Sequence, residues 1–257
     1  NTLRDLGKLK EAEQSLRKAI EINPNFAMAY SNLGNTLRDL GKLKEAEQSL
    51  LKAIEINPEF AIYHSNLGNV LSDLGKLKGA EITYKRAIGL DPNLADTHSN
   101  LGDILRDLGK LKEAEVSLLK AIEINPDYVM AYLSLSRLKY STDRNNRWQD
   151  KLFSKEIINN KSNKDQYDIY FARANIRHNE RNYKESSYYL ILANRLKILS
   201  IPSNINILLN KSKYLLAESN KNFLIPKPQK QFPQSVFIVG MPRSGSTLIE
   251  SIISLNN

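Results

Sequence analysis

The residues best suited to chemistry lie near the C-terminal end of the chain, in the loop GMPRSGST at positions 240–247. Arg243 supplies a guanidinium, Ser246 and Thr247 supply hydroxyls, and Gly245 lets the backbone come close to a ligand. Such groups, combined with free backbone N–H groups, bind anions. The loop therefore predicts an anion-binding site.

A strand and a helix must position this loop. Residues 236–239 form a continuous apolar run that ends at a glycine, as is typical of a strand buried on both faces. From Thr247 onward, apolar residues return at helical spacing, as Leu248, Ile249, Ile252 and Ile253. The N–H groups and the positive dipole end of a helix converge on such a loop. We expect a β-loop-α unit over residues 235–257; the alternative is a turn that only connects the two elements.

The loop fits the nucleotide-triphosphatase pattern GxxxxGK[ST] only in part. Gly240, Gly245 and Thr247 match, but Ser246 stands at the lysine position, and the positive charge lies three residues earlier at Arg243. A kinase or ATPase would therefore lack the group that reaches the β- and γ-phosphates. This interpretation stays open as an alternative, and it predicts a magnesium-dependent preference for ATP.

The run Pro242-Arg243-Ser244-Gly245-Ser246-Thr247 resembles the 5′-phosphosulfate-binding loop of sulfotransferases, which usually reads Pro-(Lys or Arg)-Ser-Gly-Thr-Thr. The arginine and the preceding apolar strand make it similar to the loop of protein-tyrosine sulfotransferases. Ser246 replaces the first threonine of the family pattern and keeps its hydroxyl.

This resemblance implies that 3′-phosphoadenosine 5′-phosphosulfate is the sulfate donor, with no metal required. The loop amides, the Arg243 guanidinium and the hydroxyls of Ser246 and Thr247 would hold its 5′-phosphate and sulfate, with Ser244 and Gly245 in the same loop. In the family, the catalytic base and the 3′-phosphate site come later in the chain than position 257, so the catalytic residues are unknown and this stretch alone should have no turnover. Glu250, the carboxylate near the loop, does not match the family's base.

An internal repeat organises the first half of the chain. Prolines and glycines each recur with a spacing of 34 residues, as Pro24, Pro58, Pro92 and Pro126, and as Gly7, Gly41, Gly75 and Gly109. A fixed period of this size is typical of a solenoid. Apolar residues three and four apart predict two helices in each unit, over 27–40 and 44–56, with a turn at Gly41 and an end at Pro58.

The repeated residues resemble the tetratricopeptide repeat, which has large, small and proline residues at fixed offsets. In one unit these are Tyr30, Leu33, Gly34, Leu37, Ala46, Leu50, Ala53 and Pro58, and the next two units match nearly as well. His64 and His98 stand at the first aromatic position, and we interpret them as packing residues. Bacterial proteins in which such repeats precede a sulfotransferase domain are the nearest resemblance for the chain.

The pattern weakens after the fourth unit. A fifth begins at Val129 but has Ser136 where the others have glycine, and a degenerate copy is expected over 167–197, with Arg181 in place of the turn glycine. Polar loops flank a short amphipathic helix expected at 148–159. The predicted fold is an all-α repeat solenoid followed by the first β-loop-α unit of an α/β domain. Its expected parts are a solenoid at 1–140, degenerate helical repeats at 141–223, a linker at 224–234 and the start of a sulfotransferase domain at 235–257.

The first helices of repeats line the concave face of a solenoid. Polar side chains recur on them, as Asn32, Asn66 and Asn100 at one position and as Asn35, Asn69 and Asp103 at another. Such an asparagine ladder predicts binding of a protein or an extended peptide. The alternative is that near-identical copies repeat the surface of their ancestral unit.

Composition and charge exclude several classes. No stretch approaches a membrane span, zero cysteines exclude disulfides and thiolate metal sites, and three scattered histidines indicate no metal cluster. Residues 1–140 hold 19 Lys and Arg and 19 Asp and Glu, so the net charge of +9 lies in residues 141–257, which suits an anionic ligand. The dispersed basic residues indicate no nucleic-acid partner. We expect a cytoplasmic protein without a membrane partner.

Two functions from different classes follow. The main one is a repeat-fused sulfotransferase that transfers sulfate to a hydroxyl of an acceptor recruited by the repeats, with protein tyrosine as one candidate. The alternative is a non-catalytic repeat scaffold that binds proteins.

Overall fold

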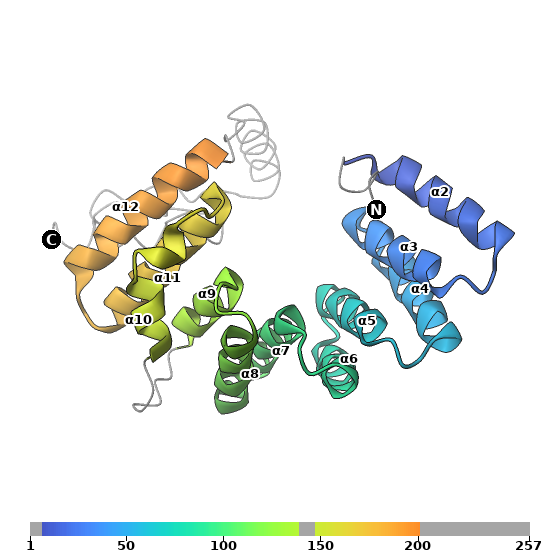
Figure 1. Ribbon diagram of the computed structural model, residues 1–257, viewed down its shortest axis with the longest axis horizontal. Coiled ribbons are helices and arrows are strands. Elements are labelled where there is room, and N and C mark those ends of the chain that lie inside the picture. Colours follow the sequence, from blue (N-terminus) through green and yellow to red (C-terminus); the bar gives the residue numbers. More distant parts are fainter. Residues whose placement is uncertain (1–6, 139–146, 201–257) are drawn as a thin grey trace, which may run out of the picture. The chain divides into compact units, whose positions relative to one another are not determined.

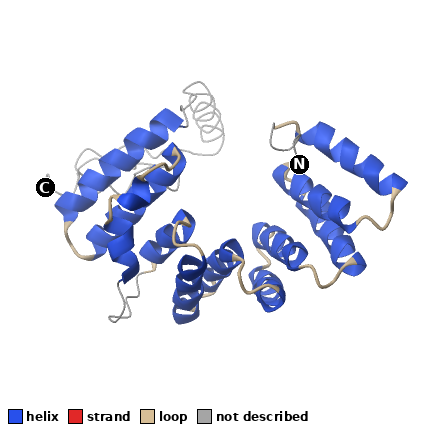
Figure 2. Ribbon diagram, in the orientation of Figure 1, coloured by secondary structure: helices blue, strands red, loops and turns tan. Residues whose placement is uncertain are grey.

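The computed structural model describes residues 7–138 and 147–200, and within these ranges all regular elements are helices (Figures 1 and 2). The eight helices of the repeats are α2 (Leu9–Ile22), α3 (Ala27–Asp39), α4 (Leu43–Ile56), α5 (Ala61–Asp73), α6 (Leu77–Leu90), α7 (Ala95–Asp107), α8 (Leu111–Ile124) and α9 (Val129–Arg137). After them come α10 (Arg147–Phe153), the 3₁₀ helix η1 (Glu156–Ile158), α11 (Asn163–Asn179) and α12 (Tyr183–Ser200). The expected linker and β-loop-α unit lie outside the described residues.

The repeat unit is a pair of antiparallel helices, as the 34-residue period predicts. α3 with α4, α5 with α6, and α7 with α8 form three successive pairs, and α2 is the second helix of the unit before them. The helices predicted at 27–40 and 44–56 are found at 27–39 and 43–56. None of the helices within residues 7–138 and 147–200 has the length and hydropathy of a membrane span.

Glycine closes the first helix of each pair. Gly41 has a φ of 76°, in the left-handed region that only glycine adopts freely. Its N–H bonds to the carbonyl of Arg38, and the N–H of Lys42 bonds to the carbonyl of Leu37. Gly75 and Gly109 make the same turn. The sharp reversal brings the second helix back against the first.

A second glycine lets the paired helices touch. A Cβ on Gly34 would lie 2.6 Å from Leu50, and one on Gly68 would lie 2.5 Å from the ring of Tyr84. Buried apolar residues from both helices of every unit then form one continuous core, including Leu33, Leu37, Leu50, Leu67, Leu71, Tyr84, Leu101, Leu105 and Leu118. The buried core therefore repeats with the same 34-residue period as the sequence.

Ion pairs with a constant spacing join consecutive units. Lys42 contacts Glu13, Lys76 contacts Glu47 and Lys110 contacts Glu81, each at 2.8 Å and each 29 residues apart. Glu13 and Glu81 are almost buried, at 9% and 8% exposed. Hydrogen bonds from Lys42 and Arg17 lower the pKa of Glu13, and those from Lys110 and Lys85 lower the pKa of Glu81.

The chain departs from the repeat after α9. Ser136, at the glycine position, is buried; its hydroxyl donates to the carbonyl of Leu133 and accepts from Asn175 on α11. A second core joins α9, α10, η1 and α11 through Val129, Tyr132, Leu133, Leu152, Ile157, Ile169, Ala172 and Ile176. The single helix expected at 148–159 was wrong: α10 ends at Phe153 and η1 begins at Glu156.

The expected degenerate copy at 167–197 is a helix pair, α11 and α12. Ser162 caps α11, its hydroxyl accepting from the N–H of Asp165. The turn to α12 has the same backbone bonds as in the repeats, but Arg181 adopts the left-handed conformation, with a φ of 62°. The repeat geometry therefore extends to a pair that lacks the turn glycine.

Candidate functional site

The six predicted ladder residues lie on three successive first helices. Asn32 and Asn35 are on α3, Asn66 and Asn69 on α5, and Asn100 and Asp103 on α7, all partly exposed. Residues three apart share one face of a helix. Hydrogen bonds link neighbouring helices: the Asn66 amide donates to the Ser31 hydroxyl at 3.1 Å, and the Asn100 amide donates to Oδ1 of Asn69 at 2.9 Å.

A small polar cavity of about 160 Å³ opens at the α5–α7 step of this ladder. Asn69, Asn100 and Asp103, three of the predicted residues, line it. Sequence reasoning missed other residues that line it, namely Arg38, Ser72, Asp73, Tyr84, Ile104 and Asp107. The 34-residue period could have identified the acidic residues, since aspartate recurs at positions 39, 73 and 107.

Tyr84 is the residue of the cavity that comes from a second helix. It stands on α6 where α4 has Leu50 and α8 has Leu118, and its side chain is only 2% exposed. Its hydroxyl donates to Oδ1 of Asn69 at 2.7 Å. Burial raises the pKa of Tyr84, so the hydroxyl keeps its proton and remains a donor.

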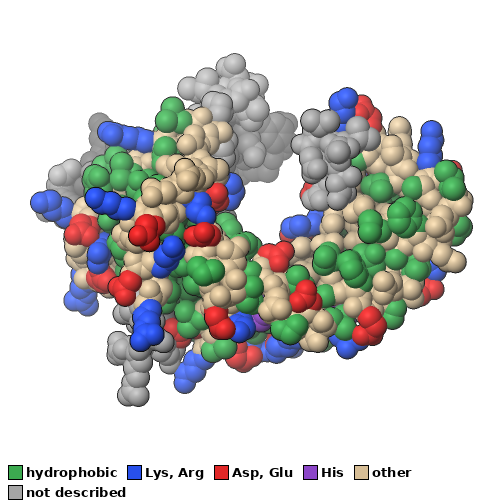
Figure 3. Space-filling view, in the orientation of Figure 1, with side chains coloured by type: hydrophobic (Ala, Val, Ile, Leu, Met, Phe, Trp, Pro, Cys, Tyr) green, Lys and Arg blue, Asp and Glu red, His purple; other side chains and the backbone are tan. Residues whose placement is uncertain are grey.

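The charges around the cavity are mostly paired and mostly acidic. Arg38 contacts Asp73 at 2.5 Å, and Arg106 contacts Asp103 at 2.6 Å and Asp107 at 3.0 Å. Acidic and basic side chains lie interspersed with apolar ones on the face that Figure 3 shows. The cavity therefore presents neutral amides within a rim of carboxylates.

The ladder residues of α3 are open to a ligand. The side chains of Asn32 and Asn35 are partly exposed and make no hydrogen bond with any residue that the structure describes. An asparagine amide offers two donors and an acceptor, the groups that pair with a peptide backbone. This part of the ladder has the chemistry for backbone recognition.

The histidines pack as predicted. The Nε2 of His64 donates to the carbonyl of Pro58 at 2.7 Å, and that of His98 donates to the carbonyl of Pro92 at 3.0 Å. The hydroxyl of Tyr132, at the same position of the next unit, donates to the carbonyl of Pro126. Each side chain holds the loop that joins two units. Within residues 7–138 and 147–200, no group of three His, Asp or Glu side chains is arranged to hold a metal.

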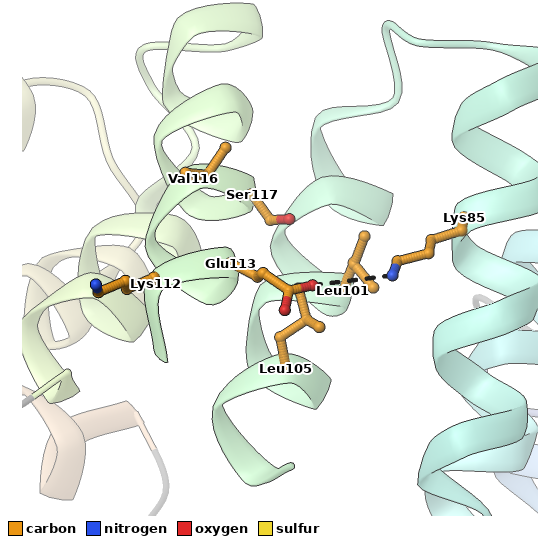
Figure 4. Close-up of a pocket in the computed structure, with 7 residues that line it drawn as sticks. All are labelled: Lys85, Leu101, Leu105, Lys112, Glu113, Val116 and Ser117. Carbon is orange, nitrogen blue, oxygen red and sulfur yellow. Dashed lines mark ion pairs between the residues drawn. The ribbon is translucent and has the colours of Figure 1, made fainter. Parts of the chain in front are cut away.

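A second pocket, of about 310 Å³, lies between the second helices α6 and α8 (Figure 4). Leu101 and Leu105 of α7 form its apolar floor, and Lys85 reaches across it to Glu113 at 3.9 Å. Val116 on its rim is 68% exposed. The pocket offers contact to an apolar side chain.

The predicted anion-binding residues Arg243, Ser244, Gly245, Ser246 and Thr247 lie outside the residues that the structure describes. Their role, and that of 3′-phosphoadenosine 5′-phosphosulfate, stays a prediction from the sequence.

Comparisons with known proteins agree with the helix pairs. Models of the TPR repeat match residues 1–37, 34–75 and 68–104, and a tetratricopeptide-repeat model matches residues 95–128. No protein of curated function matches the chain.

Several solved structures are similar to this chain, and YrrB shares its fold. The crystal structure of YrrB, described as a TPR protein with an unusual peptide-binding site, is 20% identical, covers 78% of this chain and 99% of its own, and has a TM-score of 0.54. MamA is 20% identical over 77% of this chain and 94% of its own, with a TM-score of 0.49. The first TPR of Spaghetti (RPAP3), bound to an HSP90 peptide, is 24% identical over 44% of this chain and 89% of its own, with a TM-score of 0.43. Residues 1–128 of the chain are tetratricopeptide repeats.

Proposed function

We propose that the repeats bind an extended segment of a partner protein along their first helices. The observation that carries this proposal is the ladder of side-chain amides on α3, α5 and α7, which continues into a polar cavity. An extended peptide presents backbone N–H and C=O groups at regular intervals, and asparagine pairs with both. The shared fold of YrrB, a repeat protein with a peptide-binding site, is consistent with this function.

The amides contribute because their hydrogen bonds to a ligand are not already used within the protein. Asn35 has no side-chain partner among the described residues, and Asn69 uses only its oxygen. Binding should therefore depend on these amides more than on charged residues at the rim.

Selection from a displayed library of random peptides tests this function. The selected peptides should bind Asn35→Ala and Asn69→Ala about tenfold more weakly than the unmodified protein, in line with the loss of one buried hydrogen bond. Gln48→Ala, at an exposed site of α4, is the control and should bind normally. Failure to select any peptide, or selected peptides that ignore both asparagines, would reject the proposal.

A second candidate function concerns residues 235–257. We propose that the Pro-Arg-Ser-Gly-Ser-Thr run binds the 5′-phosphosulfate of 3′-phosphoadenosine 5′-phosphosulfate, within a sulfotransferase whose acceptor the repeats recruit. The motif with its expected strand and helix, and the basic charge of residues 141–257, support this candidate.

Calorimetry on the full-length protein tests this candidate. 3′-Phosphoadenosine 5′-phosphate should bind, Arg243→Ala should lose this binding, and ATP with magnesium should bind more weakly. A preference for ATP with magnesium would instead favour a kinase or ATPase. Absence of binding by either nucleotide would leave protein binding as the function.

A further inference from the structure

We infer that Tyr84 is a positioning residue that turns the amide NH₂ group of Asn69 toward the ligand, so that this site binds a backbone carbonyl inside an extended segment. The inference rests on the proposed peptide binding and specifies which ligand group the cavity takes. Hydrogen bonds within the protein fix the side-chain oxygen of Asn69.

Both acceptor positions of the Asn69 amide are occupied within the protein. Its Oδ1 accepts from the hydroxyl of Tyr84 at 2.7 Å and from the amide of Asn100 at 2.9 Å. A carbonyl oxygen has two lone pairs, so both are used. The buried hydroxyl of Tyr84 makes no other hydrogen bond among the described residues, and rotation of the Asn69 amide would leave it without an acceptor.

The nitrogen of Asn69 remains for a ligand. Its Nδ2 has no partner in the part of the chain that the structure describes, and the residue lines the 160 Å³ cavity. A group that only donates pairs with an acceptor, either a carbonyl or a carboxylate oxygen.

The charges of the cavity decide between these two acceptors. Asp73, Asp103 and Asp107 all line it, and they outnumber the two arginines that pair with them, Arg38 in the lining and Arg106 beside it, so the net charge of this group is negative. Like charges repel a carboxylate at this range. A neutral backbone carbonyl therefore fits, and the free C-terminal carboxylate of a peptide does not.

This arrangement belongs to one unit. Leu50 and Leu118 occupy the equivalent positions of α4 and α8 and have no hydroxyl to donate. The contacts between first helices also differ. Between α5 and α7, the hydroxyls of Ser65 and Thr97 share a hydrogen bond at 2.8 Å and the amide of Asn100 donates to Asn69. Between α3 and α5, the amide of Asn66 donates to Ser31 instead. The unit formed by α5 and α6 is thus the one in which a ladder asparagine has a fixed orientation before a ligand binds.

Side-chain NMR of the free protein tests the positioning role without any ligand. In the unmodified protein the Asn69 NH₂ group should show the restricted motion of a fixed amide. Tyr84→Phe should increase its motion and shift its resonances. Tyr63→Phe, which removes the hydroxyl of a largely buried tyrosine that has no hydrogen-bond partner among the described residues, should leave them unchanged. An unchanged Asn69 amide in Tyr84→Phe would overturn the inference.

Affinity measurements test the ligand group. The probe is the tightest peptide from the library selection, synthesised once with both ends capped and once with a free carboxylate after its last contacting residue. The capped form should bind more tightly, and Tyr84→Phe should weaken it about tenfold, as for one lost hydrogen bond, while thermal stability stays close to that of Tyr63→Phe. Tighter binding of the carboxylate form, or normal binding by Tyr84→Phe, would overturn the inference. If no peptide binds the unmodified protein, the proposed function fails, and the NMR measurement still decides whether Tyr84 orients Asn69.

Discussion

The regular repeats and the α11–α12 pair build the same helix hairpin with different cores. In α3 the positions that face the core are Leu33 and Leu37, which are 3% and 0% exposed. The equivalent positions of α11 hold Arg173 and Arg177. The comparison indicates that hairpin geometry requires a turn and closely packed helices, and does not require leucine at these two positions.

Aromatic rings and carbonyl groups replace leucine around Arg173. This side chain is 6% exposed; its guanidinium donates to the carbonyls of Leu152 and Ser154, both at 2.8 Å, and lies 5.7 Å from the ring centres of Phe153, Tyr170 and Tyr189. Burial lowers the pKa of Arg173. Ring faces and carbonyl oxygens stabilise a buried cation without a carboxylate partner.

Truncation of equivalent positions gives the largest expected difference between the two regions. Leu37→Ala should lower the free energy of unfolding by about 3 kcal/mol, because it leaves a cavity in a closed core. Arg177→Ala should lower it by about 1 kcal/mol, because the partly exposed guanidinium contacts Glu180 and the ring of Phe153. Urea unfolding measures both. Equal losses would mean that the two cores depend alike on this position.

Glycine substitutions sharpen the contrast in helix contact. Gly68→Ala should lower the free energy of unfolding by about 2 kcal/mol, since the new Cβ would clash with the buried ring of Tyr84. α11 already has Ala174 at this position, buried against α12. Gly89→Ala, in α6 with no atom within 4 Å, is the control and should stabilise the protein by about 0.5 kcal/mol or more in urea unfolding. A neutral Gly68→Ala would show that the regular repeats tolerate a Cβ there too.

A glycine in the turn before α12 should stabilise the α11–α12 pair. Arg181→Gly should raise the stability of the α11–α12 pair by about 1 kcal/mol, since arginine is strained at its φ of 62°. Gly75→Ala introduces the same left-handed strain into a regular turn and should lower stability by a similar amount. Hydrogen exchange of the amides of α12 and of α6 reports each change locally. If the α12 amides exchange as fast in Arg181→Gly as in the unmodified protein, the turn is not strained.

Acid should destabilise the regular repeats through their ion pairs, with the smallest effect of the four. Hydrogen bonds from Lys110 and Lys85 lower the pKa of Glu81 below 4.5, so its stabilisation is present above pH 4.5 and is lost as the pH falls through the lower value of the folded protein. Glu81→Gln should therefore flatten the dependence of the urea midpoint on pH between 5 and 3, taken as roughly the range in which carboxylates protonate. Glu123→Gln, with a largely exposed ion pair, is the control. An unchanged slope in Glu81→Gln would contradict a stabilising role of the Lys110–Glu81 ion pair.

Regular features of the chain followed from the sequence because they are local and repeated. Gly41 and its counterparts predicted the turns, and the spacing around Leu33 and Leu37 predicted helix pairs, as the structure confirms. The ladder asparagines could be assigned to one face because a helix has a constant 3.6-residue period. The loop at 240–247 remains a prediction of the same local kind.

The sequence by itself determined where the helices, turns and repeated polar positions lie, because each depends on residues within one unit. Only the tertiary structure decided which way Asn69 points, since Tyr84 from the next helix and Asn100 from the next unit hold its oxygen. It also decided that α10 ends at Phe153, because the Arg173 guanidinium takes the carbonyls of Leu152 and Ser154. Hydrogen bonds between segments far apart in the chain depend on packing, and no local pattern encodes them.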